Sequence, residues 1–136
     1  MCVEVLKEKG YLFAQRSHEP EFRQLERGRA YDPKEDHYLL VPRVYNLGPG
    51  CPWNEFLWAI DQAKDGKIAV LGFHGVPGWW KPGEVSLEHF EKILKHLHDN
   101  GYQCVALRDL AKYVDPARGP ADPYEPIRRR VRAQQK

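Results

Sequence analysis

The pattern of hydrophobic and polar positions divides the chain into helices that alternate with short apolar runs. Over residues 86–101 large apolar side chains recur every three or four positions, which predicts an amphipathic helix. Ser86 is placed to cap its first turn and Gly101 to end it. We expect its buried face to consist of Leu87, Phe90, Ile93, Leu94 and Leu97. The same spacing over residues 52–66 predicts a second helix, with an apolar face made of Trp53, Phe56, Leu57, Ile60 and Ala63.

Short apolar runs without helical spacing predict the strands. Residues 68–73 read Ile-Ala-Val-Leu-Gly-Phe, and a continuous run of this kind suits a parallel strand that is covered on both faces. Residues 11–14 and 103–107 predict two further buried strands, and residues 38–45 predict an extended segment. Cys104 falls inside one of these strands, so we expect it to be a small buried side chain.

The order of these elements predicts an α/β fold. Helix–strand units with short connections indicate a parallel sheet with right-handed crossovers. Three buried strands cannot close a barrel by themselves, since a complete barrel of eight βα units takes ~250 residues. The pattern therefore predicts, over residues 1–115, either about three C-terminal βα units of a larger α/β architecture or a minimal open sheet. Residues 116–136 are rich in proline and arginine and lack apolar periodicity, which predicts a mobile tail.

Composition adds limits on function. The chain of 136 residues fits one domain, and its 21 basic and 19 acidic residues leave a net charge of +2. This balance gives no preference for a nucleic acid or a membrane, and no apolar run approaches the ~20 residues of a membrane span. Three cysteines far apart in the sequence predict neither a disulfide framework nor a structural zinc site. The N-terminus lacks the pattern of a secretion signal, so the cytoplasm is the default expectation.

The arginines of the tail allow a different class of function. Four of them could contact phosphates in a salt-dependent manner: Arg128, Arg129, Arg130 and Arg132. No aromatic side chains alternate with these arginines, and a proline-rich stretch precedes them. A solubilising terminus is therefore the better interpretation, and nucleic-acid binding is not expected.

His74 is the first candidate functional residue. It follows the apolar run 68–73 directly, and active sites of parallel α/β proteins lie at the carboxyl ends of the strands. An imidazole at that position could act as a general acid or base near neutral pH. The alternative is a structural histidine that is hydrogen-bonded to the backbone of its loop.

Two adjacent tryptophans follow in the same loop. Indole rings pack on the apolar faces of sugars while their N–H groups reach hydroxyls, so Trp79 and Trp80 are candidate substrate-binding residues. The competing interpretation is that they cover the rim of the sheet.

The remaining histidines predict no metal site. His96 and His98 point to different faces of their helix, and His89 lies ~10 Å from His96 at 1.5 Å per residue. His18 and His37 lie in a polar insertion and are better explained as solvated surface histidines.

The stretch "GKIAVLGFHGVP", followed by "VSLEHFEKILKHLHDNGYQCVALRDLAKYV", resembles the polysaccharide deacetylase family, whose members are (β/α)7-barrel enzymes that remove acetyl groups from carbohydrates. The resemblance covers about residues 1–115 and is strongest over residues 66–114. "LKEKGYLFAQR" also looks like an earlier helix-into-strand unit of the family. The resemblance implies a partial (β/α)7 barrel.

The resemblance also implies a metal-dependent hydrolysis. In the family an aspartate and two histidines hold a divalent metal such as zinc or cobalt, a second aspartate acts as base, and a late histidine protonates the leaving group. His74 matches that late histidine, so the general-acid role carries over to it. The aspartate and histidine motifs of the metal site have no counterpart in this sequence, so we expect the chain alone to bind no metal.

Two further positions depart from the family pattern. Gly72 stands where the family has the leucine that lines the pocket for the acetyl methyl group, and Arg16 follows the strand at which a tryptophan-containing motif is expected. Arg16 is therefore only a candidate contact for the substrate.

Together these features predict a deacetylase-like protein that acts on a carbohydrate, with His74 as general acid and little activity in the isolated chain. One alternative is a carbohydrate-binding fragment without catalysis, and another is a small α/β interaction protein with a basic tail. A truncated barrel would expose strand edges, so self-association or pairing with a missing N-terminal half is also expected.

Overall fold

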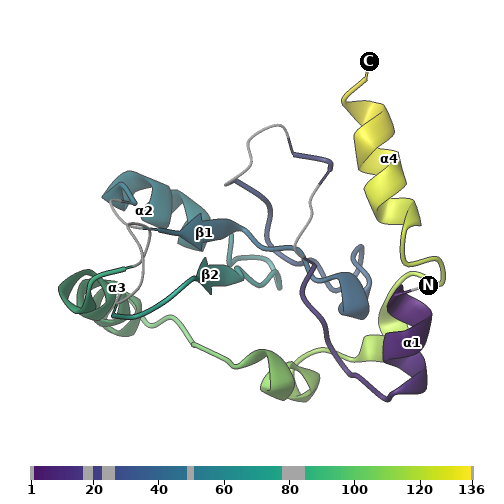
Figure 1. Ribbon diagram of the computed structural model, residues 1–136, viewed down its shortest axis with the longest axis horizontal. Helices are drawn as coiled ribbons and strands as arrows, with labels where there is room; N and C mark the ends of the chain where they lie inside the picture. The colour runs from purple at the N-terminus through teal and green to yellow at the C-terminus, as the bar shows by residue number, and fades with distance from the viewer. Residues whose placement is uncertain (1, 17–19, 23–26, 49–50, 78–84, 136) are drawn as a thin grey trace.

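The computed structural model describes residues 2–16, 20–22, 27–48, 51–77 and 85–135 (Figure 1). Its α-helices are α1 (Cys2–Glu8), α2 (Trp53–Asp61), α3 (Leu87–Asp99) and α4 (Glu125–Ala133). The strands are β1 (Tyr45–Leu47) and β2 (Leu71–Phe73), and the 3-10 turns are η1 (Tyr38–Leu40), η2 (Leu107–Lys112) and η3 (Pro116–Arg118).

β1 and β2 form a two-stranded parallel sheet, and α2 connects them. In its register Tyr45 lies beside Leu71 and Asn46 beside Gly72. The expected α/β fold with a parallel sheet is therefore confirmed at this coarse level. Isolated bridges extend the pairing on either side and join Gln15 to Val41, Arg27 to Tyr45, and Tyr31 to Ile68.

Two of the expected strands differ from the prediction. Residues 11–14 are not a strand, although Ala14 exchanges backbone hydrogen bonds with Tyr38 and Val41 and the next residue, Gln15, forms an isolated bridge with Val41. Residues 103–107 run between α3 and η2 and also form no strand. The bridges suggest the physical reason, because the polar insertion returns to the sheet and its Arg27 and Tyr31 pair beside β1 and β2. Hydrogen-bonding positions next to the two strands are thus filled by a segment that sequence periodicity does not mark.

The expected helix α3 is confirmed, together with both of its ends. Ser86 Oγ accepts a hydrogen bond from the His89 N–H at 3.2 Å, which is an ordinary N-cap. Gly101 has a φ of +71°, a left-handed conformation that favours glycine after a helix. Two members of the predicted buried face differ, because the side chains of Leu87 and Leu94 are exposed.

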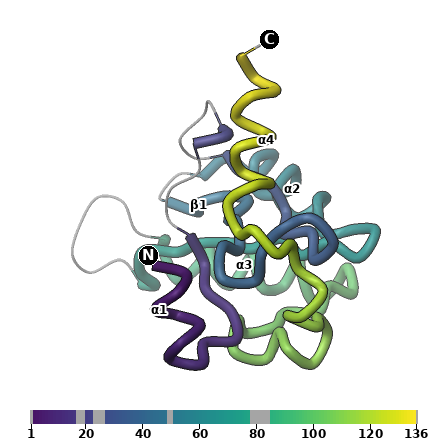
Figure 2. The backbone as a smooth tube through the Cα atoms, turned by 90° about the vertical axis from the view of Figure 1, so that its right-hand side faces the viewer, coloured from purple at the N-terminus to yellow at the C-terminus, as the bar shows by residue number. Residues whose placement is uncertain are grey.

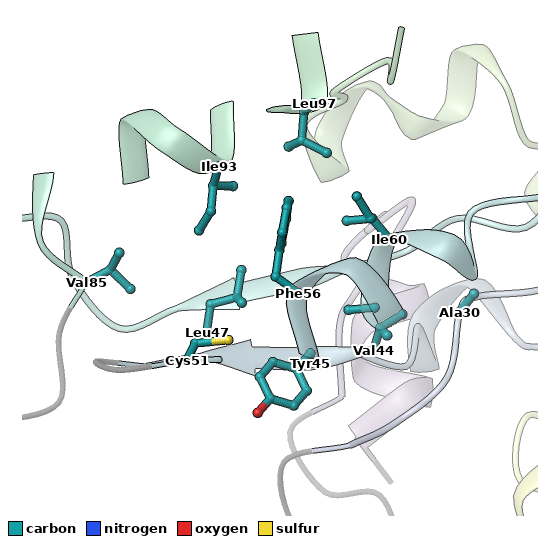
Figure 3. Packing of buried hydrophobic residues seen from close by; sticks show 11 residues of the cluster. Ala30, Val44, Tyr45, Leu47, Cys51, Phe56, Ile60, Val85, Ile93 and Leu97 are labelled. Carbon is teal, nitrogen blue, oxygen red and sulfur yellow. The ribbon is translucent and has the colours of Figure 1, made fainter. Parts of the chain in front are cut away.

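The main hydrophobic core lies between the sheet, α2 and α3. Figure 3 shows the ring of Phe56 from α2 facing Ile93 and Leu97 of α3, with Leu47 of β1 below. Phe56 is fully buried. This packing removes the apolar faces of α2, α3 and β1 from water. Because β2 is paired with β1, the same packing sets the position of the end of β2 relative to the helices.

A second, smaller core lies beneath the N-terminal part of the chain. It joins Phe13 and Val41, the bridge partner of Gln15, to Leu110 of η2 and to Val114. The first helix–strand segment is thus packed on the last residues of the α/β part, although the two are far apart in sequence.

The segment for which the sequence predicts a mobile tail contains the helix α4. Pro126 lies in its first turn, where a missing N–H breaks no intrahelical bond, so proline does not prevent this helix. Figures 1 and 2 show α4 at the periphery, with its C-terminal end pointing away from the sheet. Its Arg130 side chain reaches Asp36 at 2.8 Å. Of the helices in the described ranges, none combines the length and the apolar character needed to cross a membrane.

Candidate functional site

His74 lies directly after β2, at the carboxyl end of the parallel sheet, and it is exposed. Its Nε2 is 2.7 Å from Nδ2 of Asn46, the middle residue of β1. The parallel register explains this contact, because Asn46 is the partner of Gly72 and His74 follows two residues later on the same side of the strand. The sheet therefore holds the imidazole through an amide on the neighbouring strand.

Gly72 allows a close approach of Arg43 beside this pair. A Cβ atom at position 72 would lie 2.7 Å from Cδ of Arg43 and 3.1 Å from Oδ1 of Asn46. Any side chain there would displace Arg43 from the sheet. The position that carries the pocket leucine in the deacetylase pattern is thus covered by the stem of an arginine.

The chemistry open to the His74 imidazole depends on its partner, the uncharged amide of Asn46. The Asn46 amide donates through Nδ2 to an unprotonated Nε2, and after rotation it accepts through Oδ1 from a protonated Nε2. It can therefore hold the ring of His74 in both protonation states. Within the described ranges no residue bonds to Nδ1 of His74. The arrangement suits transfer of a proton to or from a bound molecule.

Arg16, the other described candidate, lies in a different environment. It is only 8% exposed, and its guanidinium pairs with the fully buried carboxylate of Glu21 through NH1 at 2.7 Å and through NH2. Burial is the largest single influence on the pKa of Glu21 and raises it, but the hydrogen bonds from Arg16, a backbone hydrogen bond and the charges of Arg16 and Arg130 together hold that pKa below its ordinary value. The pairing gives Arg16 a structural role, and contact with a substrate stays a prediction.

Around Glu21 further charged side chains form what we call the ionic cluster. Its members are Arg16, Glu21, Arg29, Glu35, Asp36 and Arg130. Arg130 of α4 contributes three contacts, with Asp36 at 2.8 Å, with Glu35 at 3.4 Å and with Glu21 at 3.7 Å. These six members are three cations and three carboxylates, and Arg129 of α4 adds a further contact with Glu35 at 3.3 Å. We regard the ionic cluster as a structural group that attaches α4 to the N-terminal half.

The other described histidines have structural partners. Nδ1 of His37 accepts a hydrogen bond from the Leu39 N–H at 3.1 Å, and its burial lowers its pKa. His89 and His96 both contact the ring of Trp53 edge-on. No three His, Cys, Asp or Glu side chains gather into a possible metal site in the part of the chain that the structure describes. The described residues therefore do not fit the metal set that the resemblance implies.

Trp79 and Trp80, with which the sequence predicts sugar binding, lie outside the described residues, as does His18. Sequence reasoning missed Asn46 and Arg43. The available signal was an asparagine one residue before a leucine in an otherwise apolar stretch, but its pairing with Gly72 depends on a register that the sequence does not specify.

Comparison of the chain with protein-family models, with curated proteins and with solved structures finds no match.

Proposed function

We propose that the chain is the C-terminal part of a polysaccharide deacetylase-like hydrolase, in which His74 acts as general acid toward an acetylated carbohydrate. The observation that carries this proposal is the placement of an exposed imidazole at the carboxyl end of β2, held by Asn46 at 2.7 Å. The resemblance of the sequence around His74 to the late histidine motif of that family supports it.

The proposed step is a proton transfer. Water adds to the acetyl carbon, and as the bond from that carbon to the sugar nitrogen or oxygen breaks, the leaving nitrogen or oxygen takes a proton from Nδ1 of the His74 imidazolium. The products are acetate and the free amine or hydroxyl of the sugar. The neutral ring keeps the hydrogen on Nε2 and stays oriented because Nε2 donates it to Oδ1 of Asn46. In family members a divalent metal polarises the acetyl carbonyl, and since the described residues form no such site, we derive no step of this chain through a metal.

A second candidate function is carbohydrate binding without hydrolysis. The observation that favours it is the contact between Gly72 and Arg43, because a guanidinium stem covers the position at which the family has an apolar pocket for the methyl group. Arginine there would suit the hydroxyl or carboxylate groups of a sugar better than an acetyl methyl group.

Acetate release separates the two functions. The full chain is incubated with an N-acetylglucosamine pentamer or an O-acetylated xylan oligomer, with Zn²⁺ or Co²⁺ added, and acetate is measured by a coupled assay. The hydrolase proposal expects that any release disappears in His74→Ala, because no proton donor remains for the leaving group. The matched control is His98→Ala, since His98 is exposed on α3 and its partner is Asp99.

Because the chain lacks the metal motifs, release from the isolated chain is expected to be slow, so binding of the same oligomers is measured in parallel by calorimetry. Binding without release favours the second function. Neither binding nor release with any of these oligomers would contradict both functions.

A further inference from the structure

A large apolar groove lies on the side of β2 that faces away from β1. Its volume is about 890 Å³, and its walls come from β2 and the residues before it, from α3, and from the segment 102–114. Figure 1 shows this last segment running from α3 to η2 as an arc beside β2. Adjacent strands in a sheet lie ~4.8 Å apart, which leaves no space between them. The segment 103–107 is therefore opposite β2 and is not paired with it.

The main chain on the β2 side of the groove carries open hydrogen-bonding groups. Ile68 directs its N–H and C=O to Tyr31, and the C=O of Val70 accepts from Val44. Since successive residues of an extended chain point to opposite edges, Ala69 directs its N–H and C=O toward the groove. Among the described residues none pairs with these two groups of Ala69, and β2 has β1 as its one strand neighbour.

The opposite side of the groove has the same property. The N–H of Tyr102 bonds to Leu97, and the C=O of Ala106 accepts from Asp109. Between these two contacts the N–H and C=O groups of residues 103–105 have no backbone partner in the described part of the chain. Two extended main-chain segments with open donors and acceptors thus line opposite sides of one groove.

The side chains that line the groove are mostly apolar and incompletely buried. The run 68–73 predicts a strand that is covered on both faces, yet every residue in it is partly exposed. Three large apolar side chains of the lining are more exposed still: Leu94 at 44%, Val105 at 39% and Tyr113 at 56%. Cys104, expected to be buried, is exposed at the same place because its segment does not join the sheet. An occupant of the groove would remove this apolar surface from water.

From these observations we infer that the groove binds an extended apolar segment of another protein, which enters as an added strand beside β2. Only a polypeptide supplies N–H and C=O groups on both of its edges at the spacing that Ala69 and residues 103–105 require. An acyl chain would fill the apolar volume but leave the main-chain groups of both walls without partners. This inference does not depend on His74, which lies outside the lining of the groove.

The experiment uses Cys104 as the reporter. In the full chain with Cys2→Ser, the remaining cysteines are Cys104, which is exposed, and Cys51, which is buried. The rate at which Cys104 reacts with a chromogenic disulfide reagent is measured as a lysine-flanked Thr-Val-Thr-Val-Thr-Val peptide is added. We expect the reaction to slow saturably, by about tenfold when the peptide is at ten times its Kd, because the occupied fraction is shielded.

Two matched controls distinguish strand addition from apolar adsorption. The same peptide with alternate amide nitrogens methylated keeps its side chains but loses the N–H groups of one edge, and it should give no protection. Leu94→Glu, which places a charge in the wall of the groove, should abolish protection by the unmodified peptide. Leu87→Glu should not, because Leu87 is an exposed leucine of the same helix outside the groove.

Each other outcome overturns the inference. Equal protection by both peptides, or by dodecanoate alone, would mean that the groove takes apolar ligands without main-chain pairing. Absence of protection by the unmodified peptide up to its solubility limit would mean that no strand enters. Slower reaction of Cys104 as the protein concentration rises without peptide, with a dimer in sedimentation, would assign the groove to a second copy of the chain.

Discussion

The core around Phe56 and the ionic cluster around Glu21 hold the two halves of the molecule by different physics. Around Phe56 the sheet, α2 and α3 exclude water from apolar side chains, and each contact there is tolerant of small shifts. Around Glu21, charges from separate parts of the chain meet, and the carboxylates of Glu21 and Asp36 have little access to water. Such a group contributes little net stability when complete and costs much when one member is removed. The comparison teaches that ion pairs attach α4 to the rest of the chain, whereas burial of apolar side chains holds the α/β part together.

The largest effect is expected in the apolar core. Phe56→Ala leaves a cavity between α2 and α3, and it should lower the free energy of unfolding by about 3–5 kcal/mol. Its neighbour Leu57 is 37% exposed, so Leu57→Ala should cost only about 0.5 kcal/mol. Urea unfolding followed by tryptophan fluorescence measures both. Similar losses for the two variants would contradict the assignment of Phe56 to the centre of the core.

The next largest effect is expected in the ionic cluster. Glu21→Gln removes the carboxylate that Arg16 and Arg130 share, and the buried cations that remain should destabilise the fold by about 3 kcal/mol. The control is Asp61→Asn, because Asp61 forms an exposed pair with Lys64 and should cost about 0.5 kcal/mol. Chemical denaturation compares them, and an equal cost for both would mean that the cluster is effectively solvated.

A smaller effect is expected at Gly72, where the apolar sheet meets a charged side chain. In Gly72→Ala the new methyl group would overlap the stem of Arg43, which is flexible enough to move away, so the loss should be about 1 kcal/mol. When Gly72→Ala is made in a chain that already carries Arg43→Ala, it should leave the free energy of unfolding almost unchanged. A double-mutant cycle by thermal unfolding measures the coupling, and a coupling of zero would exclude the contact.

The smallest effect is a dependence on pH at His37. Burial lowers the pKa of its imidazole from the ordinary 6.5, so the unfolded chain binds a proton at a pH where the folded chain does not. Stability from this group is therefore complete above pH 6.5 and falls as the pH decreases toward the lowered pKa. His37→Asn keeps an acceptor for the Leu39 N–H. In this variant the free energy of unfolding should change less steeply with pH between pH 7 and pH 5, and the difference in slope should correspond to at most about one bound proton. Identical slopes would contradict the shift.

The two regions also differ in how far the sequence predicts them. The centres of the buried faces of α2 and α3 follow from helical spacing, although Leu57, Leu87 and Leu94 of the predicted faces are exposed. The caps at Ser86 and Gly101 follow from local chemistry. The ionic cluster could not be predicted, because Glu21 and Arg130 are more than a hundred residues apart and each looks like an ordinary surface charge. Sequence spacing carries information about contacts within one element and little about contacts between distant segments.

The candidate site shows the same limit. The position of His74 could be predicted because it follows directly from the end of one apolar run. Its partner Asn46 could not, since the contact depends on the register between β1 and β2. The failure at residues 103–107 has a related cause, because an apolar run indicates burial but does not say whether a neighbouring strand is present to pair with it.

The central claim is that His74 meets a carbohydrate at the carboxyl end of β2. The most direct measurement is the imidazole resonances of the full chain, recorded by NMR during titration with the N-acetylglucosamine pentamer. The account predicts a saturable shift of the His74 signals, reduced in Asn46→Ala, while those of the exposed His98 stay unchanged. Unchanged His74 signals at oligomer concentrations that saturate binding elsewhere on the chain would contradict it.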